Sequence, residues 1–152
     1  NAPVDSSGSI RESVKRARER GILFDLGHGA GSLSFKVSRS MLEQDFMPDS
    51  ISSDVHQLSI DGPAFDILVT MSKFLCFGMP LGKIIASSTC TPARAIGRQD
   101  LGTLGVGSPG DAAVLSIQEG QFEYRDVTGD TFLGKQMLVA EQVVVGGKIW
   151  EK

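Results

Sequence analysis

The order of hydrophobic and polar positions alternates between helix-like and strand-like patterns from the start of the chain. Apolar residues spaced three or four apart predict a helix that begins at Ser9, with Glu12 completing a capping box, and ends at Gly21. Its basic residues are interleaved with acidic ones, which indicates an exposed helix face. The apolar run 22–26 is too continuous for a one-sided surface strand and predicts a buried strand.

The same alternation continues through the middle of the chain. The elements expected there are a helix, a strand and three further helices, at 34–45, 50–53, 65–77, 81–88 and 91–95. Thr91 is the expected N-cap of the last helix and Pro92 its first residue. Because alternating helices and strands form parallel sheets, the pattern predicts an α/β fold.

The pattern changes at Gly97, where glycines and prolines interrupt the chain and strand-like alternation follows. Strands are predicted at 112–117, 122–127, 137–145 and 148–150, with hairpin turns at Gly129-Asp130 and Gly146-Gly147. We therefore expect two domains, an α/β part over residues 1–100 and a β-rich appendage over residues 101–152.

Charge and composition argue against two classes of partner. The 152 residues carry a net charge of −3 with both signs interspersed, so no nucleic-acid partner is expected. No apolar run reaches the roughly 20 residues that span a bilayer, so no membrane partner is expected either. Cys76 and Cys90 are predicted to be free thiols, which favours a cytoplasmic location. The chain shows no targeting peptide and no initiator Met, so it is expected to begin inside a longer reading frame.

Two loops that follow predicted strands carry the candidate chemistry. Gly27-His28-Gly29 follows the first strand and Asp54-Val55-His56 follows the second, so both histidines of the chain lie near strand ends. In parallel α/β folds, ligands bind just past the carboxyl ends of the strands. An aspartate beside histidine at such an edge can ligate a metal or transfer a proton. Asp54 is therefore the leading candidate, with His28 displayed toward a ligand.

Other interpretations of these residues stay open. The glycines of 27–32 could hold a phosphate at a helix N-terminus, although the dinucleotide fingerprint requires glycine where Ser32 stands. They also suit a tight loop that binds nothing. Asp54 could be a capping or surface residue, and one carboxylate with two histidines does not by itself close a catalytic zinc site.

Several short motifs together cover nearly the whole chain. They are Phe24–Ser32, Ile51–His56, Met71–Phe74, Gly78–Leu81, Thr89–Ala95, Gly102–Leu104 and Gly107–Leu115. In combination, the T-x-x-P-A-R helix and the G-x-L-x-x-G-x-x-G-D segment are fairly specific. The set resembles the C-terminal portion of the amidohydrolase superfamily, in its dihydroorotase-like deacetylase branch.

The resemblance implies a (β/α)8 TIM barrel with one or two divalent metals, expected to be zinc, and a small β-sandwich. Asp54 would end the eighth barrel strand, ligate the more buried metal, and act as general base and then acid. His28 would end the seventh strand near the substrate, with Gly27 and Gly29 beside it, and His56 would line the pocket. The substrate would be a small molecule carrying an acyl group in amide or ester linkage.

Most of the barrel described by this resemblance has no counterpart in the chain. The family's H-x-H pair, its strand-four lysine, its two later histidines and six strands are absent, so the barrel is incomplete. We expect a C-terminal segment of a metal-dependent amidohydrolase, inactive alone, that pairs with the N-terminal portion of the barrel or with itself. The alternative is a non-catalytic α/β module for small-anion binding or oligomerisation.

Overall fold

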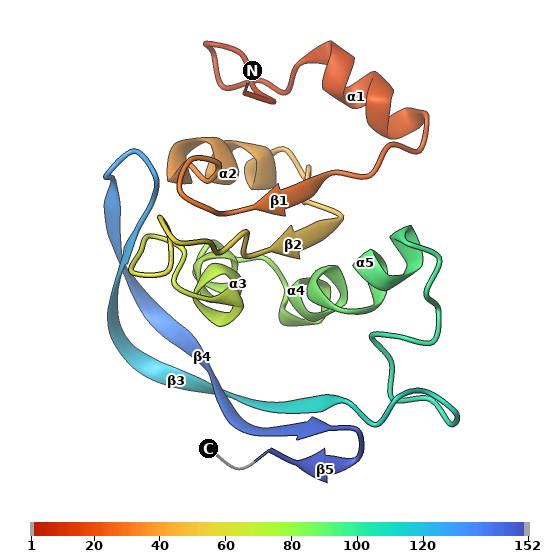
Figure 1. The fold of residues 1–152 in the computed structure, drawn as a ribbon. Helices are drawn as coiled ribbons and strands as arrows, with labels where there is room; N and C mark the ends of the chain where they lie inside the picture. The colour runs from red at the N-terminus through yellow and green to blue at the C-terminus, as the bar shows by residue number, and fades with distance from the viewer. Residues whose placement is uncertain (1, 151–152) are drawn as a thin grey trace.

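Helices and strands alternate through the first part of the chain in the computed structural model, which describes residues 2–150 (Figure 1). The helices are α1 (Glu12–Glu19), α2 (Phe35–Glu43), α3 (Ile67–Cys76), α4 (Leu81–Ser88) and α5 (Cys90–Ala95). The strands are β1 (Asp25–Gly27), β2 (Ser50–Ser52), β3 (Ala112–Arg125), β4 (Thr131–Val145) and β5 (Lys148–Ile149). The α/β class predicted from the sequence is confirmed. None of the helices in 2–150 is long and apolar enough to cross a membrane.

Strands β1 and β2 form a parallel pair whose two faces differ. In their register Leu26 lies beside Ile51, and Ile51 is buried against α3 and α4. Asp25 lies beside Ser50 on the other face, where the aspartate is exposed. Within residues 2–150 these strands pair only with each other, so they do not close a barrel.

The second sheet is antiparallel and is formed by β3, β4 and β5. Figure 1 shows helices α3 to α5 between the parallel pair and the long β3–β4 hairpin, and β4 packs on α3. Tyr124 and Leu138 of the hairpin share one core cluster with Ile51, Phe74 and Ile84. The hairpin thus helps to bury the α/β core, while the expected division at residue 100 stays a prediction.

The predicted β-sandwich is present only as this single sheet among residues 2–150. The separate strands expected at 112–117 and 122–127 are one strand, β3, with a register shift between Glu119 and Phe122. An irregularity of this kind bends a strand without ending it, because pairing with the partner strand resumes beyond it. The two predicted turns, at Gly129-Asp130 and Gly146-Gly147, are confirmed.

Several predicted boundaries were wrong, and the largest error is in the strand predicted at 137–145, which is β4 and starts at Thr131. Helix α1 has Arg11 at its N-cap, because Ser9 and Ile10 belong to a turn in which Ile10 bridges Val4. Strand β1 starts only where pairing with β2 starts, which leaves the predicted strand residues Ile22 and Leu23 53% and 52% exposed.

A further error concerns the short helix α5. It begins at Cys90, so Thr89 is its N-cap and Pro92 lies within its first turn. Proline is tolerated there because the first amides of a helix have no partner inside it.

Helix α1 has no buried residue and is attached through Arg18. The Arg18 guanidinium donates to the Met47 carbonyl at 2.7 Å, pairs with Asp49 at 3.1 Å and lies 3.6 Å from the ring centroid of Phe46. Arginine suits this place because its planar group stacks and forms hydrogen bonds at the same time. The prediction of a wholly exposed basic face is therefore wrong for Arg18.

Candidate functional site

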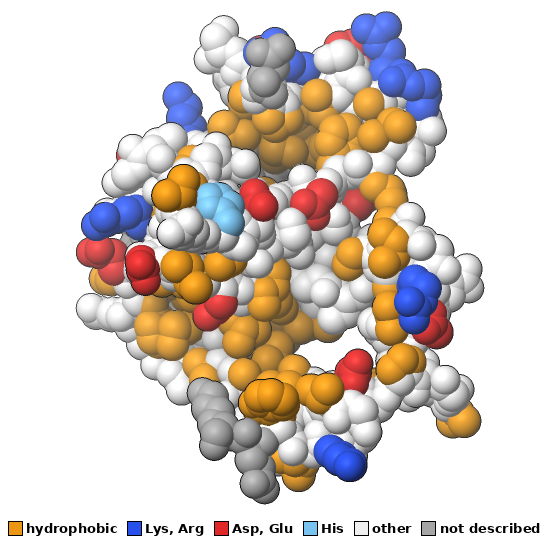
Figure 2. Space-filling model, viewed as in Figure 1, with side chains coloured by type: hydrophobic (Ala, Val, Ile, Leu, Met, Phe, Trp, Pro, Cys, Tyr) orange, Lys and Arg blue, Asp and Glu red, His pale blue; other side chains and the backbone are white. Residues whose placement is uncertain are grey.

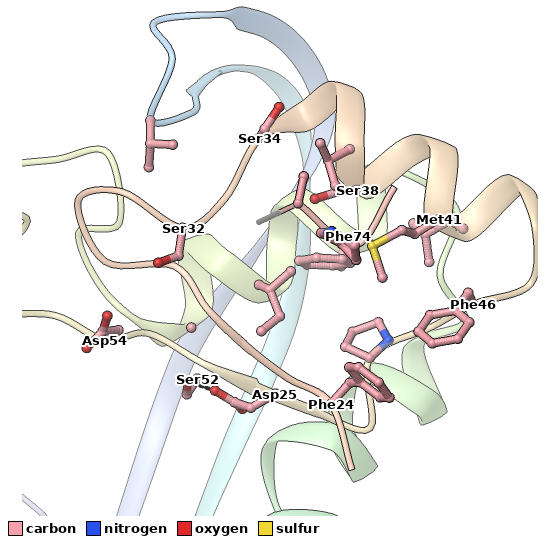
Figure 3. Close-up of a pocket in the computed structure, with 18 of the residues that line it drawn as sticks. Phe24, Asp25, Ser32, Ser34, Ser38, Met41, Phe46, Ser52, Asp54 and Phe74 are labelled. Carbon is pink, nitrogen blue, oxygen red and sulfur yellow. Dashed lines mark hydrogen bonds between the residues drawn. The ribbon is translucent and has the colours of Figure 1, made fainter. Parts of the chain in front are cut away.

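Asp54 lies two residues past β2, at the carboxyl end of the parallel pair, and its side chain is exposed. Its backbone is left-handed, with φ of 47°. Aspartate adopts this conformation more readily than most residues, although it remains unfavourable for any residue with a Cβ. The turn projects the carboxylate away from the strand end, beside the loop that carries Ser32 (Figure 3). The predicted position of Asp54 at a strand end is confirmed.

Gly29 packs directly against this aspartate. Its amide donates to the Ser53 carbonyl at 2.9 Å, and a Cβ built on Gly29 would lie 2.6 Å from Asp54 Oδ2. Gly29 also has a positive φ of 48°, which favours glycine. A Cβ on Gly27 would lie 3.4 Å from the Asp54 Cβ. Both glycines therefore make room for Asp54, and their contact with a substrate stays a prediction.

His28 is packed inward. The side chain is fully buried, with Nδ1 3.0 Å from the Gly29 carbonyl and Nε2 2.6 Å from the Lys73 ammonium. Burial, and then the charge of Lys73, lower the pKa of His28 below its ordinary value, which favours the neutral ring. The His28 ring is therefore not displayed at the surface as expected, because its Nε2 accepts a hydrogen bond from the buried Lys73 ammonium. Its assignment to substrate binding stays a prediction.

Lys73 is the main feature of the site that sequence reasoning missed. It lies in α3, is fully buried, and donates to the carbonyls of Pro63 at 2.7 Å and Arg125 at 2.8 Å as well as to His28. Burial lowers the pKa of Lys73 to about 8, partly offset by the negative charge of Asp126. A lone lysine within the apolar run 65–77 was the available signal, since a buried cation requires partners.

Asp126 is the second buried charge near this site. Its Oδ2 accepts from the Phe35 amide at 2.8 Å, while Oδ1 accepts from the amides of Thr128 at 2.8 Å and Asp130 at 3.0 Å. Burial alone would raise the pKa of Asp126, but these hydrogen bonds outweigh it and hold the pKa below its usual value. The first amide of α2 is thereby occupied by a carboxylate of the chain itself. This arrangement disfavours the anion-binding alternative, which needs that helix terminus.

His56 is exposed in the loop that follows Asp54. Its Nδ1 accepts from the Leu58 amide at 3.1 Å, and its own amide donates to the buried hydroxyl of Ser59 at 3.0 Å. No hydrogen bond joins His56 to Asp54 or His28 within the described part of the chain. The structure therefore places His56 on the same loop as Asp54, where lining a pocket stays a prediction.

A cavity of about 1170 Å³ is lined by the three residues of β1 and reaches Asp54. Its apolar part lies between the N-terminal segment and α2, and includes Phe24, Met41 and Phe46 (Figure 3). Its polar end contains Asp25, whose carboxylate accepts from Ser50 at 2.5 Å and from Ser52 at 2.7 Å. Figure 2 shows a hydrophobic hollow beneath the N-terminal segment and a row of carboxylates beside a histidine.

The residues of this chain do not fit a zinc site on their own. Among residues 2–150 no three His, Cys, Asp or Glu side chains come together as a possible metal site. Catalytic zinc usually has three protein ligands, and both nitrogens of His28 are already engaged. Asp54 remains a single candidate ligand, so other ligands would have to come from outside the described residues.

Three curated proteins with similar sequences are named deacetylases. The chain is 33% identical to a deacetylase of Brucella anthropi over 135 residues, which are 89% of this chain and 34% of that protein. It is 33% identical to a deacetylase of Agrobacterium fabrum over 89% of this chain and 33% of that protein. It is 29% identical to an Enterococcus faecalis deacetylase over 96% of this chain and 40% of that protein. No protein-family model matches the chain.

Two solved structures share the fold. A crystal structure of an adenine deaminase matches with a TM-score of 0.93 and 28% identity, over 98% of this chain and 41% of that chain. A crystal structure of a dihydroorotase matches with a TM-score of 0.79 and 31% identity, over 97% of this chain and 42% of that chain.

The parallel βα units, with an aspartate past the end of their second strand, define an α/β protein. The matches are more specific: the chain belongs to the amidohydrolase superfamily, as its motifs indicated. It spans about a third to two fifths of the length of the proteins that it matches.

Proposed function

We propose that the chain supplies one part of the active site of a hydrolase that removes an acyl group from a small molecule, by cleaving an amide or ester bond. The observation that carries this proposal is the exposed Asp54 carboxylate, which lies past the end of β2 on a left-handed backbone. Gly29 lies beside it, and its lack of a side chain leaves room for the carboxylate. The deacetylase names of its relatives support an acyl substrate. We propose as well that the chain is inactive on its own, because its site is incomplete.

The chemical role of Asp54 is proton transfer. An exposed carboxylate can take a proton from the attacking water and return it to the departing amine or alcohol. Gly29, in the loop that follows His28, packs against this carboxylate. A divalent metal, expected to be zinc, belongs to an assembly that adds further ligands, so the step assigned to this chain is the proton transfer at Asp54.

The partner we propose is the remainder of the barrel. The outer edge of β1 is unpaired among residues 2–150, and the cavity along it combines apolar walls with unpaired backbone. A neighbouring strand would satisfy that edge and cover the cavity at once. A second copy of this chain is the other candidate occupant. The free thiols of Cys76 and Cys90 support a reducing, cytoplasmic setting for this assembly.

A chimera tests the proposed function. The chain replaces the matching third of the Brucella anthropi deacetylase, and release of acetate from N-acetyl and O-acetyl substrates is measured. We expect Asp54→Asn to lower kcat about 10²–10⁴-fold, which is the usual contribution of a general acid–base residue. Asp45→Asn is the matched control, since Asp45 is also exposed with a positive φ of 55° but lies just after α2. Full turnover in the Asp54 variant would refute the assignment.

A further inference from the structure

Four segments of the chain converge on the Lys73 ammonium. Lys73 comes from α3, and its three partners are His28 after β1, the Pro63 carbonyl in the loop after β2, and the Arg125 carbonyl at the end of β3. An ammonium has three protons to donate, and all three are used. An apolar side chain could not replace it there, because each acceptor would then be buried without a donor.

This arrangement fixes the tautomer of His28. An ammonium cannot accept a hydrogen bond, so the ring nitrogen facing it, Nε2, must carry no proton. The proton therefore resides on Nδ1, which donates to the Gly29 carbonyl at 3.0 Å. A second proton on the ring would point at the Lys73 cation, and the lowered pKa of His28 agrees with its exclusion.

The orientation of His28 is transmitted to Asp54 by Gly29. The Gly29 carbonyl is held by the ring, and the Gly29 amide is held by the Ser53 carbonyl at 2.9 Å. Gly29 lies so close to the Asp54 carboxylate that even a methyl group would come within 2.6 Å of Oδ2. A rotation of the 27–31 loop would therefore displace the Asp54 carboxylate.

We propose that Lys73 is a positioning residue of the Asp54 site: it locks His28 in the Nδ1–H tautomer and thereby fixes the Gly29 loop against Asp54. Through the Arg125 carbonyl it also ties this loop to the β3–β4 hairpin. The catalytic consequence rests on the proposed function, whereas the tautomer and the loop order do not. Lys73 itself is buried and does not touch the substrate.

The two histidines make the tautomer directly measurable. We expect ring ¹⁵N spectra of the full chain at neutral pH to show two opposite patterns. His28 carries its proton on Nδ1, while neutral His56 carries it on Nε2, because its Nδ1 accepts from the Leu58 amide. A His28 ring protonated on Nε2 in the unaltered chain would overturn the proposal, and this measurement requires no variant.

A variant then tests the transmission to Asp54. Lys73→Met removes the donor, and Lys83→Met is the matched control at an exposed lysine in α4. We expect Lys73→Met to abolish the His28 pattern and to accelerate hydrogen exchange of the Gly29 amide by at least about tenfold. The Ile84 amide, bonded to the Pro80 carbonyl in α4, should keep its rate. Equal acceleration at both amides would indicate general loosening and overturn the proposal.

Kinetics in the chimera separate the two proposals. A positioning role predicts that Lys73→Met lowers kcat with little change in KM, while Lys83→Met leaves both unchanged. Lys73→Gln retains a donor and is expected to recover part of kcat, and it replaces Lys73→Met if the latter does not fold. If the His28 tautomer and the Gly29 exchange rates are as expected but kcat of the chimera does not depend on Asp54, only the proposed function is refuted. If kcat depends on Asp54 but the His28 ring is protonated on Nε2, only the role of Lys73 is refuted.

Discussion

The two faces of the β1–β2 pair are built from neighbouring residues and behave differently. Ile51 is buried in the core among side chains of α3 and α4, so this chain completes that face by itself. On the opposite face Asp25 accepts from two serine hydroxyls and remains exposed, and Asp54 follows at its end. Stability and candidate chemistry are thus separated across one pair of strands. The buried face fixes the fold, and the open face holds exposed polar groups that the proposed partner would cover.

The largest expected effect tests the buried face. Ile51→Ala removes a core side chain and should lower the free energy of unfolding by about 2–5 kcal/mol. Ser52→Ala, at the next position on the open face, should cost less than about 1.5 kcal/mol, because the hydroxyl bonds an exposed carboxylate. Chemical denaturation of both variants measures the difference. Similar losses would show that the two faces contribute equally to stability.

An intermediate effect is expected where the loop meets Asp54. Gly29→Ala places a Cβ on a left-handed backbone and should lower the free energy of unfolding by about 1–2 kcal/mol. Because that Cβ also displaces the Asp54 carboxylate, we expect kcat of the chimera to fall further than stability alone explains. Gly31→Ala is the control, since a Cβ there meets no atom within 4 Å. Equal kinetic losses in both variants would show that the Gly29–Asp54 contact has no special role.

The sequence predicted one side of this comparison better than the other. The alternation of helix and strand and the position of Asp54 could be read locally, because periodicity and strand ends are properties of short segments. The His28–Lys73 and Lys73–Arg125 contacts join residues 45 and 52 positions apart, and no local pattern encodes such pairs. The mostly apolar run 22–26 suggested a longer strand, but strand length depends on the pairing partner.

The smallest expected effect is a change of stability with pH that reports the burial of Lys73. The pKa of Lys73 is lowered from 10.5 to about 8, so above pH 8 the folded chain loses this proton while the unfolded chain keeps it until about pH 10.5. Unfolding then binds a proton, and the free energy of unfolding rises with pH in that window, while below pH 8 both states hold the proton and this contribution is constant.

The difference between the unaltered chain and Lys73→Met isolates this contribution, because other titrating groups largely cancel. We expect that difference to shift in favour of the unaltered chain by about 1 kcal/mol between pH 7 and pH 9. Lys83→Met should show no such shift, since that lysine is exposed. A difference that is independent of pH would mean that Lys73 titrates as it does in the unfolded chain. Lys73 would then be accessible to water. The contrast between a buried and an open face would hold for the β1–β2 strands but not for the 27–31 loop beside Asp54.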